Sequence, residues 1–229
     1  KQRRWMTNLG LIFFNTFIVR ITVGAMVFTV AIFAQENSWG LFNYIETSPW
    51  FVIIVSIIVL DFAMYLQHII FHAFPILWRL HRVHHVDLDF DVSTGLRFHP
   101  LEIILSLFYK SIIVIAIGAP PMAVVIFEII LNASSQFNHG NVFIPKRIDR
   151  LLRYIIVTPD MHRIHHSTIV DETNSNYGFS ISLWDRLCGT YKKFSKLGQL
   201  DMEIGLKEFR NQNKLGILNL ITFPFYEKE

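Results

Sequence analysis

Four blocks of apolar residues constrain the fold of this chain more than any other feature of its sequence. They cover residues 9–34, 50–72, 101–117 and 120–136. A helix of about 20 apolar residues crosses the hydrocarbon core of a bilayer, where every backbone polar group needs a partner within the protein. The blocks therefore predict an all-α integral membrane protein with about four transmembrane or hairpin helices.

The composition agrees with this prediction and narrows the possible chemistry. Of the 229 residues, 52% are hydrophobic and 17% are charged, whereas about a quarter of a typical soluble domain is charged. The single cysteine, Cys188, excludes a disulfide framework and a cysteine-based metal site. The net charge of +3 is small and the basic residues flank the apolar blocks, so we expect no nucleic-acid partner.

Basic residues also predict the orientation in the membrane. They precede the first block and follow the second and fourth, whereas the loop 35–49 has none. These residues are Lys1, Arg3, Arg4, Arg79, Arg82, Arg97, Lys146, Arg147, Arg150 and Arg153. Because Lys and Arg remain on the cytoplasmic side, both termini and the segments 79–99 and 138–191 are expected there. The chain begins with Lys rather than Met, so we expect it to be trimmed, and residues 1–229 are treated as one domain.

The histidines form the second strong pattern. One pair has the spacing i, i+4, two HxxHH motifs follow, and two histidines stand alone. The ten are His68, His72, His81, His84, His85, His99, His139, His162, His165 and His166. Helical residues spaced by three or four share one face, so each group can direct two or three imidazoles at one point.

Two explanations of these groups compete. A lone histidine is more often a hydrogen-bonded polar residue or a helix-end residue, and one HxxxH pair can arise by chance. Three groups beside apolar blocks are harder to explain in that way, because adjacent imidazoles repel as cations and are costly to bury without a partner. We therefore predict a metal site, in which the isolated His99 and His139 also take part.

The ligand types narrow the choice of metal. A zinc-protease helix needs a Glu beside its first histidine, but only apolar residues separate His68 from His72. A bis-histidine haem would use single histidines on facing helices, and structural zinc commonly uses cysteine. Many imidazoles without a thiolate fit a dinuclear, redox-active iron centre, although zinc can occupy such a site in a purified sample.

The histidine groups stand within an ordered set of longer motifs. These are Asp61–His72, Leu77–His85, Arg97–Glu102, Asn138–Asn141, Pro159–His166, Asn176–Phe179 and Trp184–Tyr191. In order and spacing, residues 52–191 resemble the fatty acid hydroxylase/sterol desaturase superfamily of membrane di-iron oxidases. An HxxxH pair alone is weak evidence, whereas this ordered set is highly specific.

The resemblance implies that all ten histidines are ligands, or neighbours of ligands, of two iron ions in a cytosolic helical cap. It implies O2 as co-substrate and hydroxylation or desaturation of a C–H bond in a sterol, fatty acyl, sphingolipid or ether lipid. Residues 1–229 contain no recognisable cytochrome domain. We therefore expect a separate electron-donor protein, either a cytochrome, a ferredoxin or a reductase.

Carboxylates near the histidines are candidates for orienting them, because a metal-bound imidazole usually donates its other N–H to such a group. The main candidates are Asp160 and Asp185, with solvated loop acids as the alternative. Further candidates are Asp61, Asp87, Asp89 and Asp91.

Two other functions fit parts of the sequence. One is a histidine-rich membrane protein that binds or transports metal without oxidase activity. It predicts ionisable residues at mid-depth in the helices, where Arg20, Asp61 and Glu128 qualify. The other is a lipid-binding protein without catalysis, which we would expect to have lost some ligands, and no expected histidine is missing.

Overall fold

The computed structural model describes the backbone of residues 2–22 and 25–226 and, apart from 20–22, their side chains. Lys1 and the Arg20 side chain, both used in the sequence predictions, lie outside this description. The described residues form helices and loops, with isolated bridges at Ile156–Ile181 and Ser167–Ile204 but no strand. The predicted all-α class is confirmed.

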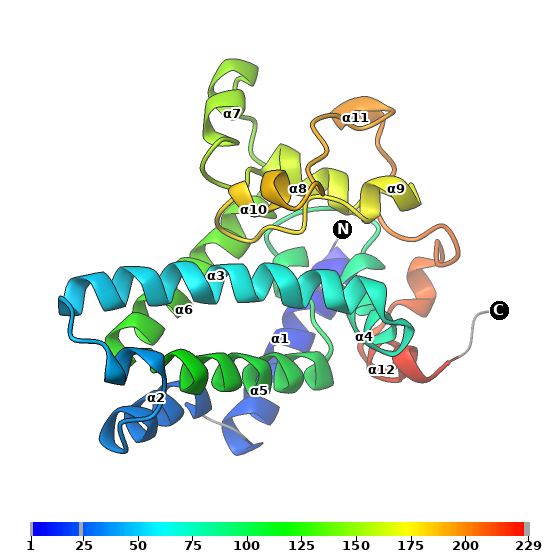
Figure 1. Ribbon diagram of the computed structural model, residues 1–229. Coiled ribbons are helices and arrows are strands. Elements are labelled where there is room, and N and C mark those ends of the chain that lie inside the picture. Colours follow the sequence, from blue (N-terminus) through cyan, green and yellow to red (C-terminus); the bar gives the residue numbers. More distant parts are fainter. Residues whose placement is uncertain (1, 23–24, 227–229) are drawn as a thin grey trace.

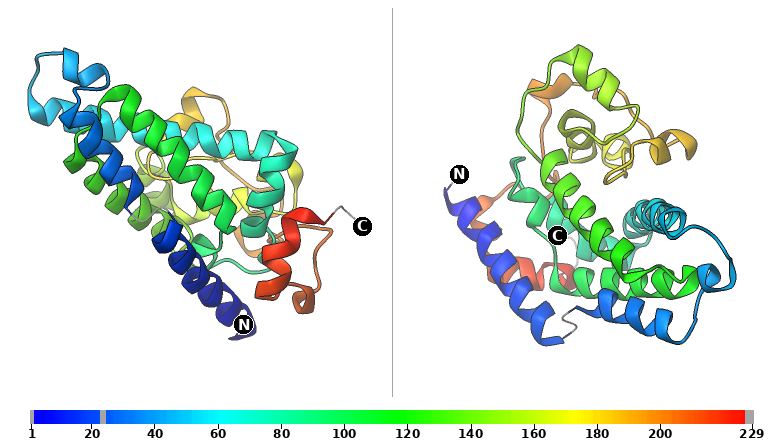
Figure 2. Two further views of the ribbon diagram at one scale, coloured as in Figure 1. Left: turned by 90° about the horizontal axis from the view of Figure 1, so that it is seen from below. Right: turned by 90° about the vertical axis from the view of Figure 1, so that its left-hand side faces the viewer.

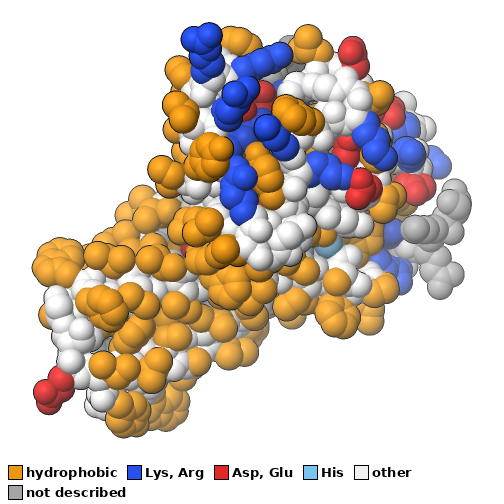
Figure 3. All heavy atoms as spheres, turned by 45° about the horizontal axis from the view of Figure 1, so that its top comes forward, with side chains coloured by type: hydrophobic (Ala, Val, Ile, Leu, Met, Phe, Trp, Pro, Cys, Tyr) orange, Lys and Arg blue, Asp and Glu red, His pale blue; other side chains and the backbone are white. Residues whose placement is uncertain are grey.

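Five helices form the apolar part of the molecule, which we call the bundle (Figure 1). They are α1 (Gln2–Thr22), α2 (Met26–Glu36), α3 (Pro49–Ala73), α5 (Pro100–Ile117) and α6 (Pro121–Asn138). Both α2 and α3 pack against α5 and α6, and α1 slants along one side of this group (Figure 2). The surface of the bundle is almost continuously hydrophobic, whereas Lys and Arg side chains gather on the rest of the molecule (Figure 3).

Two of the bundle helices meet the requirements of a membrane span. Among the described residues, α3 and α5 are long and apolar enough to cross a bilayer. The predicted block 9–34 is divided between α1 and α2, and Gly24, a weak helix former, stands between them. Of the expected four spans, two helices are therefore candidate spans, and the other two stay a prediction.

The predicted hairpin joins α5 to α6. Gly118 ends α5 in the left-handed conformation, with φ of 69°, which glycine adopts without steric cost. Pro121 then occupies the first position of α6, where its missing N–H is no loss. The third and fourth apolar blocks therefore form two helices joined by this tight turn, and α2 and α3 pack against both of them.

A proline also sets the corner between α3 and α4 (Pro75–His85). Pro75 disfavours a helical conformation at the preceding residue, and Phe74 is accordingly extended, with φ of −97° and ψ of 121°. The chain turns there, and α4 packs back against the end of α3. This corner brings the HxxxH pair at the end of α3 close to the HxxHH motif of α4.

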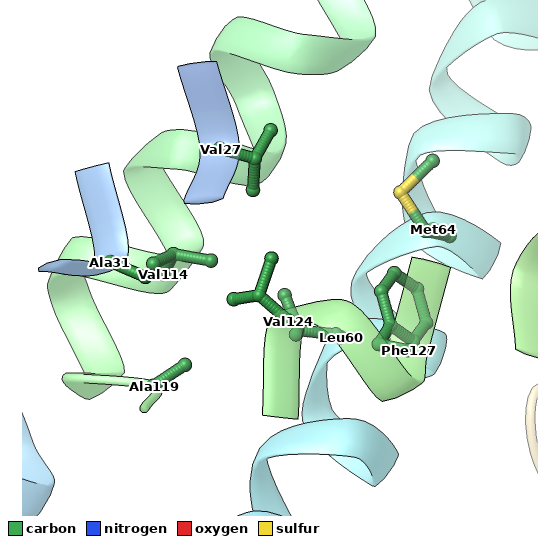
Figure 4. Close-up of a cluster of buried hydrophobic side chains, with 8 residues drawn as sticks. All are labelled: Val27, Ala31, Leu60, Met64, Val114, Ala119, Val124 and Phe127. Atoms are coloured by element: carbon green, nitrogen blue, oxygen red, sulfur yellow. The ribbon is translucent and has the colours of Figure 1, made fainter. Parts of the chain in front are cut away.

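A cluster of buried side chains holds the bundle together between α2, α3, α5 and α6 (Figure 4). Small residues in it allow the helices to approach closely, as is usual between membrane helices. The members are Val27, Ala31, Leu60, Met64, Val114, Ala119, Val124 and Phe127.

The remaining elements are short and form, with α4, a polar part that we call the cap. They are η2 (Thr94–Leu96), α7 (Lys146–Leu152), α8 (Pro159–His165), α9 (Val170–Thr173), α10 (Leu183–Leu187), α11 (Gly198–Asp201), η3 (Gln212–Lys214), α12 (Ile217–Thr222) and η4 (Phe223–Phe225). A further turn, η1 (Leu41–Tyr44), lies in the loop between α2 and α3.

A buried carboxylate ties α1 to the cap. Asp87 accepts hydrogen bonds from Arg4 (2.8 Å), Asn8 (3.1 Å) and Thr94 (2.9 Å), and its other oxygen lies 3.4 Å from Arg97. Asp89 and Asp91 also pair with Arg4. These three aspartates were candidates for orienting metal ligands, but their partners here are arginines and neutral side chains. Burial without such partners would be costly, so the network fixes how α1 meets the cap.

We expect Phe127→Ala to destabilise the bundle, because Phe127 is 1% exposed in the core cluster. The loss should be about 2 kcal/mol, below the 3–5 kcal/mol of soluble cores, since lipid is as apolar as the core. Thermal unfolding in lipid nanodiscs measures it. Ile129→Ala, at a 64% exposed position of the same helix, is the matched control. Equal melting temperatures for the two variants would contradict the assigned packing.

Candidate metal centre

Nine of the ten histidines meet between α3, α4, the end of α6, and α8. They form two groups, in each of which the possible ligand atoms lie within 4.8 Å of one another. The five-histidine group is His68, His72, His81, His85 and His165. The four-histidine group is His84, His139, His162 and His166.

Each HxxHH motif supplies both groups rather than one. On α4, His81 and His85 point to the five-histidine group, and His84 points to the other. The motif at α8 does the reverse, with His165 alone in the five-histidine group. The groups are adjacent, since the rings of His85 and His166 stack with centroids 4.5 Å apart. The arrangement therefore offers two neighbouring metal positions.

Hydrogen bonds fix the tautomer of several rings. The Nδ1 atoms of His68, His139 and His165 lie 2.7–2.8 Å from the carbonyl oxygens of Tyr177, Ser135 and Ser175. A carbonyl only accepts, so each Nδ1 carries the proton and each Nε2 presents a lone pair. These Nε2 atoms are therefore in the form that binds a metal ion.

Glu102 fixes a fourth ring. Its Oε1 lies 2.6 Å from Nδ1 of His81, and both side chains are buried. The Nε2 lone pair of His81 then faces Nε2 of His68 at 3.0 Å. Two lone pairs at that distance repel unless a cation lies between or beside them. The donor set thus fits a metal ion in the five-histidine group.

Buried nitrogens without partners lead to the same conclusion. Within the described part of the chain, Nε2 of His72, His85 and His165 and both ring nitrogens of His166 have no hydrogen-bond partner. Each such buried atom costs about 1–3 kcal/mol when left unsatisfied. Coordination by two metal ions, one in each group, would satisfy the three Nε2 atoms and one of the two nitrogens of His166, and the residues present fit two ions.

Burial also keeps these rings neutral. It lowers the pKa of His165 to about 3 and the pKa of His139 to about 4, with backbone hydrogen bonds opposing the change. The pKa values of His84, His162 and His166 are also lowered, by burial first and by neighbouring histidines second. Neutral imidazole is the form that ligates a metal. These five rings therefore need not lose a proton at pH 7 before they bind one.

His99 is the exception among the predicted ligands. It lies outside both groups: its Nδ1 accepts from the backbone N–H of Leu101 (3.2 Å), and its Nε2 donates to the carbonyl of Ile221 (2.9 Å). It therefore caps the start of α5 and joins it to α12. The prediction that His99 is a ligand is corrected, because both ring nitrogens have partners in the protein.

The two main carboxylate candidates differ in position. Asp185 is fully buried and accepts from the backbone N–H groups of Tyr177 (2.7 Å) and Gly178 (2.9 Å), which places the carbonyl that orients His68. Burial raises the pKa of Asp185 to about 6. Asp160 instead pairs with Arg163 and contacts none of the histidines in the described structure. Asp185 thus acts through the backbone, whereas Asp160 belongs to the cap surface.

The carboxylate in direct contact with a ligand was missed by sequence reasoning. Glu102 follows His99 in the first turn of an apolar helix. A carboxylate at such a position is unusual, and this signal could have identified Glu102 as a candidate. Asp61, by contrast, accepts from Trp184 Nε1 (2.8 Å) and the N–H of Ile181 (3.2 Å), so it ties α3 to the cap.

A cavity of about 510 Å³ lies among α1, α3, α5 and α6, and one end of it lies close to the histidines without being lined by them. Five of its lining residues contact or closely approach histidine rings of the two groups. These are Gly95, Phe98, Glu102, Ser135 and Phe179. Half of the other lining residues are apolar and half are polar or charged, and the volume is typical of a small-molecule site. The histidines therefore lie behind one end of a partly apolar cavity in the bundle.

The fold and site define a helical membrane protein with a histidine-rich metal centre, and sequence comparison identifies its family. Residues 52–190 match the family described as Fatty acid hydroxylase, and the chain belongs to it. This confirms the predicted superfamily. No solved structure matches the chain.

Several curated proteins are similar to the chain. An ornithine lipid hydroxylase of Rhizobium tropici is 28% identical over 179 residues, covering 78% of this chain and 51% of that protein. Alkylglycerol monooxygenase of Homo sapiens is 33% identical over 168 residues, covering 72% and 35%. A cholesterol 25-hydroxylase-like protein of Danio rerio is 26% identical over 161 residues, covering 66% and 62%. The chain thus spans about half or less of the first two relatives.

We expect Glu102→Gln to weaken metal binding by about 10- to 100-fold, the usual cost of losing a carboxylate that orients a ligand. The amide keeps the shape of the Glu102 side chain. It lacks the negative charge that makes His81 a stronger ligand for a metal ion. Anaerobic titration of the metal-free protein with ferrous iron measures the change. Glu46→Gln, in the exposed loop before α3, is the control. Unchanged affinity in Glu102→Gln would contradict the assigned role.

His85→Ala and His99→Ala should differ in metal content. Removal of His85, a member of the five-histidine group, should reduce bound iron from two ions per chain toward one. His99→Ala should keep both ions and lower stability by about 1 kcal/mol, as expected for loss of a helix cap. Elemental analysis after reconstitution distinguishes them, and loss of iron from His99→Ala would restore it as a ligand.

Proposed function

We propose that the protein is an O2-dependent di-iron oxidoreductase that hydroxylates or desaturates a C–H bond of a membrane lipid. One observation carries this proposal: a partly apolar cavity among the bundle helices reaches residues that contact the rings of a nine-histidine centre. The relatives named for lipid hydroxylation, ornithine lipid hydroxylase and alkylglycerol monooxygenase, support the same class of substrate.

The overall reaction balances with two electrons and two protons. For hydroxylation, RH + O2 + 2e⁻ + 2H⁺ gives ROH + H2O; for desaturation, the same equivalents give an alkene and two molecules of water. Two iron ions, when bound by the two histidine groups, would supply the reduction of O2 and the oxidation of the C–H bond. The electrons are proposed to come from a separate cytochrome, ferredoxin or reductase.

The chain's own residues shape and dry the reacting end of the cavity. Phe98 stacks on His84 with ring centroids 4.6 Å apart, and Phe179 lies 5.0 Å from the His68 ring. A Cβ at Gly95 would lie 2.9 Å from the ring of His139. The two aromatic rings exclude water, and the absence of a side chain at Gly95 lets its backbone pack closely against the His139 ring. These residues place the end of the cavity against both histidine groups.

We also propose that the cap and both termini lie on the cytoplasmic side, with the bundle in the bilayer. The division of the surface into a hydrophobic bundle and a cap rich in Lys and Arg supports this (Figure 3). A lipid would then enter the cavity from the membrane, and an electron donor would approach the cap from the cytoplasm.

The proposal predicts lipid oxidation by the reconstituted protein. The chain in nanodiscs is loaded anaerobically with ferrous iron, given a chemical reductant and a mixture of sterols, acyl lipids and ether lipids, and then exposed to O2. Mass spectrometry should detect a product 16 mass units heavier or 2 units lighter than one lipid. His85→Ala, which loses a group member, is the matched control.

The rival function, metal binding or transport without oxidation, gives the opposite result. It predicts no oxidised lipid in any class, together with metal uptake by proteoliposomes that contain the protein. Uptake without product would replace the oxidase proposal with the transport proposal.

A further inference from the structure

An ion pair lines the cavity well away from the histidines. Lys110 on α5 is only 6% exposed and pairs with Glu128 on α6, and both side chains line the cavity. The sequence predictions had named Glu128 but not Lys110 among the ionisable residues of the apolar blocks. A buried charge within an apolar helix is costly, and the metal centre does not use this one.

The pair lies about two helical turns from the metal centre. Glu102, which bonds His81, precedes Lys110 by eight residues on α5, and Ser135, which bonds His139, follows Glu128 by seven on α6. At 1.5 Å per residue these separations are about 12 and 10 Å. The separations along the two helices are similar. The cavity therefore has one end near the histidines and, opposite it, a charged end.

Neutral polar groups line the wall between the two ends. One of them, Asn15, is 4% exposed and donates through Nδ2 to the carbonyl of Phe98 (2.8 Å), while its Oδ1 is buried with no partner in the described structure. A buried acceptor without a partner is costly. The others are Thr16, Gln67, Ser106, Asn132 and Ser135. The cavity therefore offers hydrogen bonds as well as apolar contact.

The charge balance of the pair indicates which polar group would bind. An ammonium donates and a carboxylate accepts, so together they match a hydroxyl, which does both. A carboxylate ligand would compete with Glu128 for Lys110, and a cationic ligand would compete with Lys110 for Glu128. A cationic ligand would leave the buried Lys110 unpaired, which is strongly unfavourable, and a carboxylate would leave Glu128 unpaired, at a smaller cost because its side chain is one-third exposed.

We propose that Lys110 and Glu128 form a recognition site for the hydroxyl of a neutral lipid, with its chain running toward the histidines. This deepens the proposed function, because it names the substrate class: neutral, hydroxyl-bearing lipids rather than free fatty acids or cationic amphiphiles. The polar group would then lie about 10–12 Å from the end near the histidines, at 1.5 Å per residue along α5 and α6.

Binding of three lipids with one chain length tests the proposal without any oxidation. The probes are hexadecan-1-ol, hexadecanoate and hexadecylammonium, added to the zinc-loaded protein in phosphatidylcholine nanodiscs and measured by equilibrium binding. The wild-type chain should prefer the alcohol by about tenfold over either charged probe. Glu128→Gln leaves Lys110 unpaired and should shift the preference to hexadecanoate, whereas Lys110→Met should shift it to hexadecylammonium.

Three further measurements separate recognition from a structural role. The double variant Lys110→Met/Glu128→Gln leaves no unpaired charge, so it remains folded if a single variant does not, and it should lose the tenfold preference. Lys192→Met, which breaks a solvent-exposed ion pair with Asp171 in the cap, should leave the preference intact. Lower melting temperatures with unchanged selectivity would overturn the proposal, because the pair would then only join α5 to α6.

The outcome is independent of the oxidase assay. If selectivity shifts as expected and the iron-loaded protein oxidises no lipid, the hydroxyl site stands and the proposed function fails. If lipid is oxidised and all variants bind the three probes alike, the proposed function stands and the hydroxyl site fails.

Discussion

The structure depends on nine imidazoles packed against one another, eight of them buried and His72 half-buried. Bare imidazoles would not pack in this way, because Nε2 of His68 and Nε2 of His81 face each other at 3.0 Å and seven ring nitrogens have no hydrogen-bond partner among the described residues. Metal ions would remove the first cost and reduce the second. Because ligands on α3, α4, the end of α6 and α8 meet only in the folded chain, the free energy of metal binding would also stabilise the fold.

The corner at Phe74–Pro75 and the crossing of the two HxxHH motifs create that meeting point. Since α4 turns back along α3, a pair on each helix faces the other. His84 and His165 are exchanged between the two groups. His84 belongs to the four-histidine group although the rest of its motif belongs to the other, and His165 belongs to the five-histidine group although the rest of its motif does not. This exchange makes the two histidine groups parts of one cluster rather than two separate clusters.

Polar contacts outside the centre hold the cap in place. Arg82 lies between metal-binding neighbours on α4, and its guanidinium donates to the carbonyl of Phe223 at 2.7 Å and packs 4.5 Å from that ring. His99 bonds the carbonyl of Ile221 in the same segment. The C-terminal segment, in which the sequence offers no recognisable motif, therefore fixes the helix that carries His81, His84 and His85.

The sequence by itself determined the class of fold and, among ten predicted ligands, the nine histidines that the structure brings into the two groups. Apolar blocks predict helices because lipid leaves the backbone no other partner, and three of the four blocks match observed helices. Histidine spacing predicts a metal centre because i, i+3 and i+4 positions share a face. These are local properties, so they are visible along the chain.

Only the tertiary structure decided which histidines share an ion and which acids assist them. His99 was expected to bind metal but caps a helix, Glu102 was overlooked but orients His81, and Asp87 pairs with arginines. Lys110 meets Glu128 only because the turn between α5 and α6 brings these two long side chains within reach of each other. Spacing specifies the face of one helix, whereas the partner of a side chain depends on how helices distant in sequence pack together.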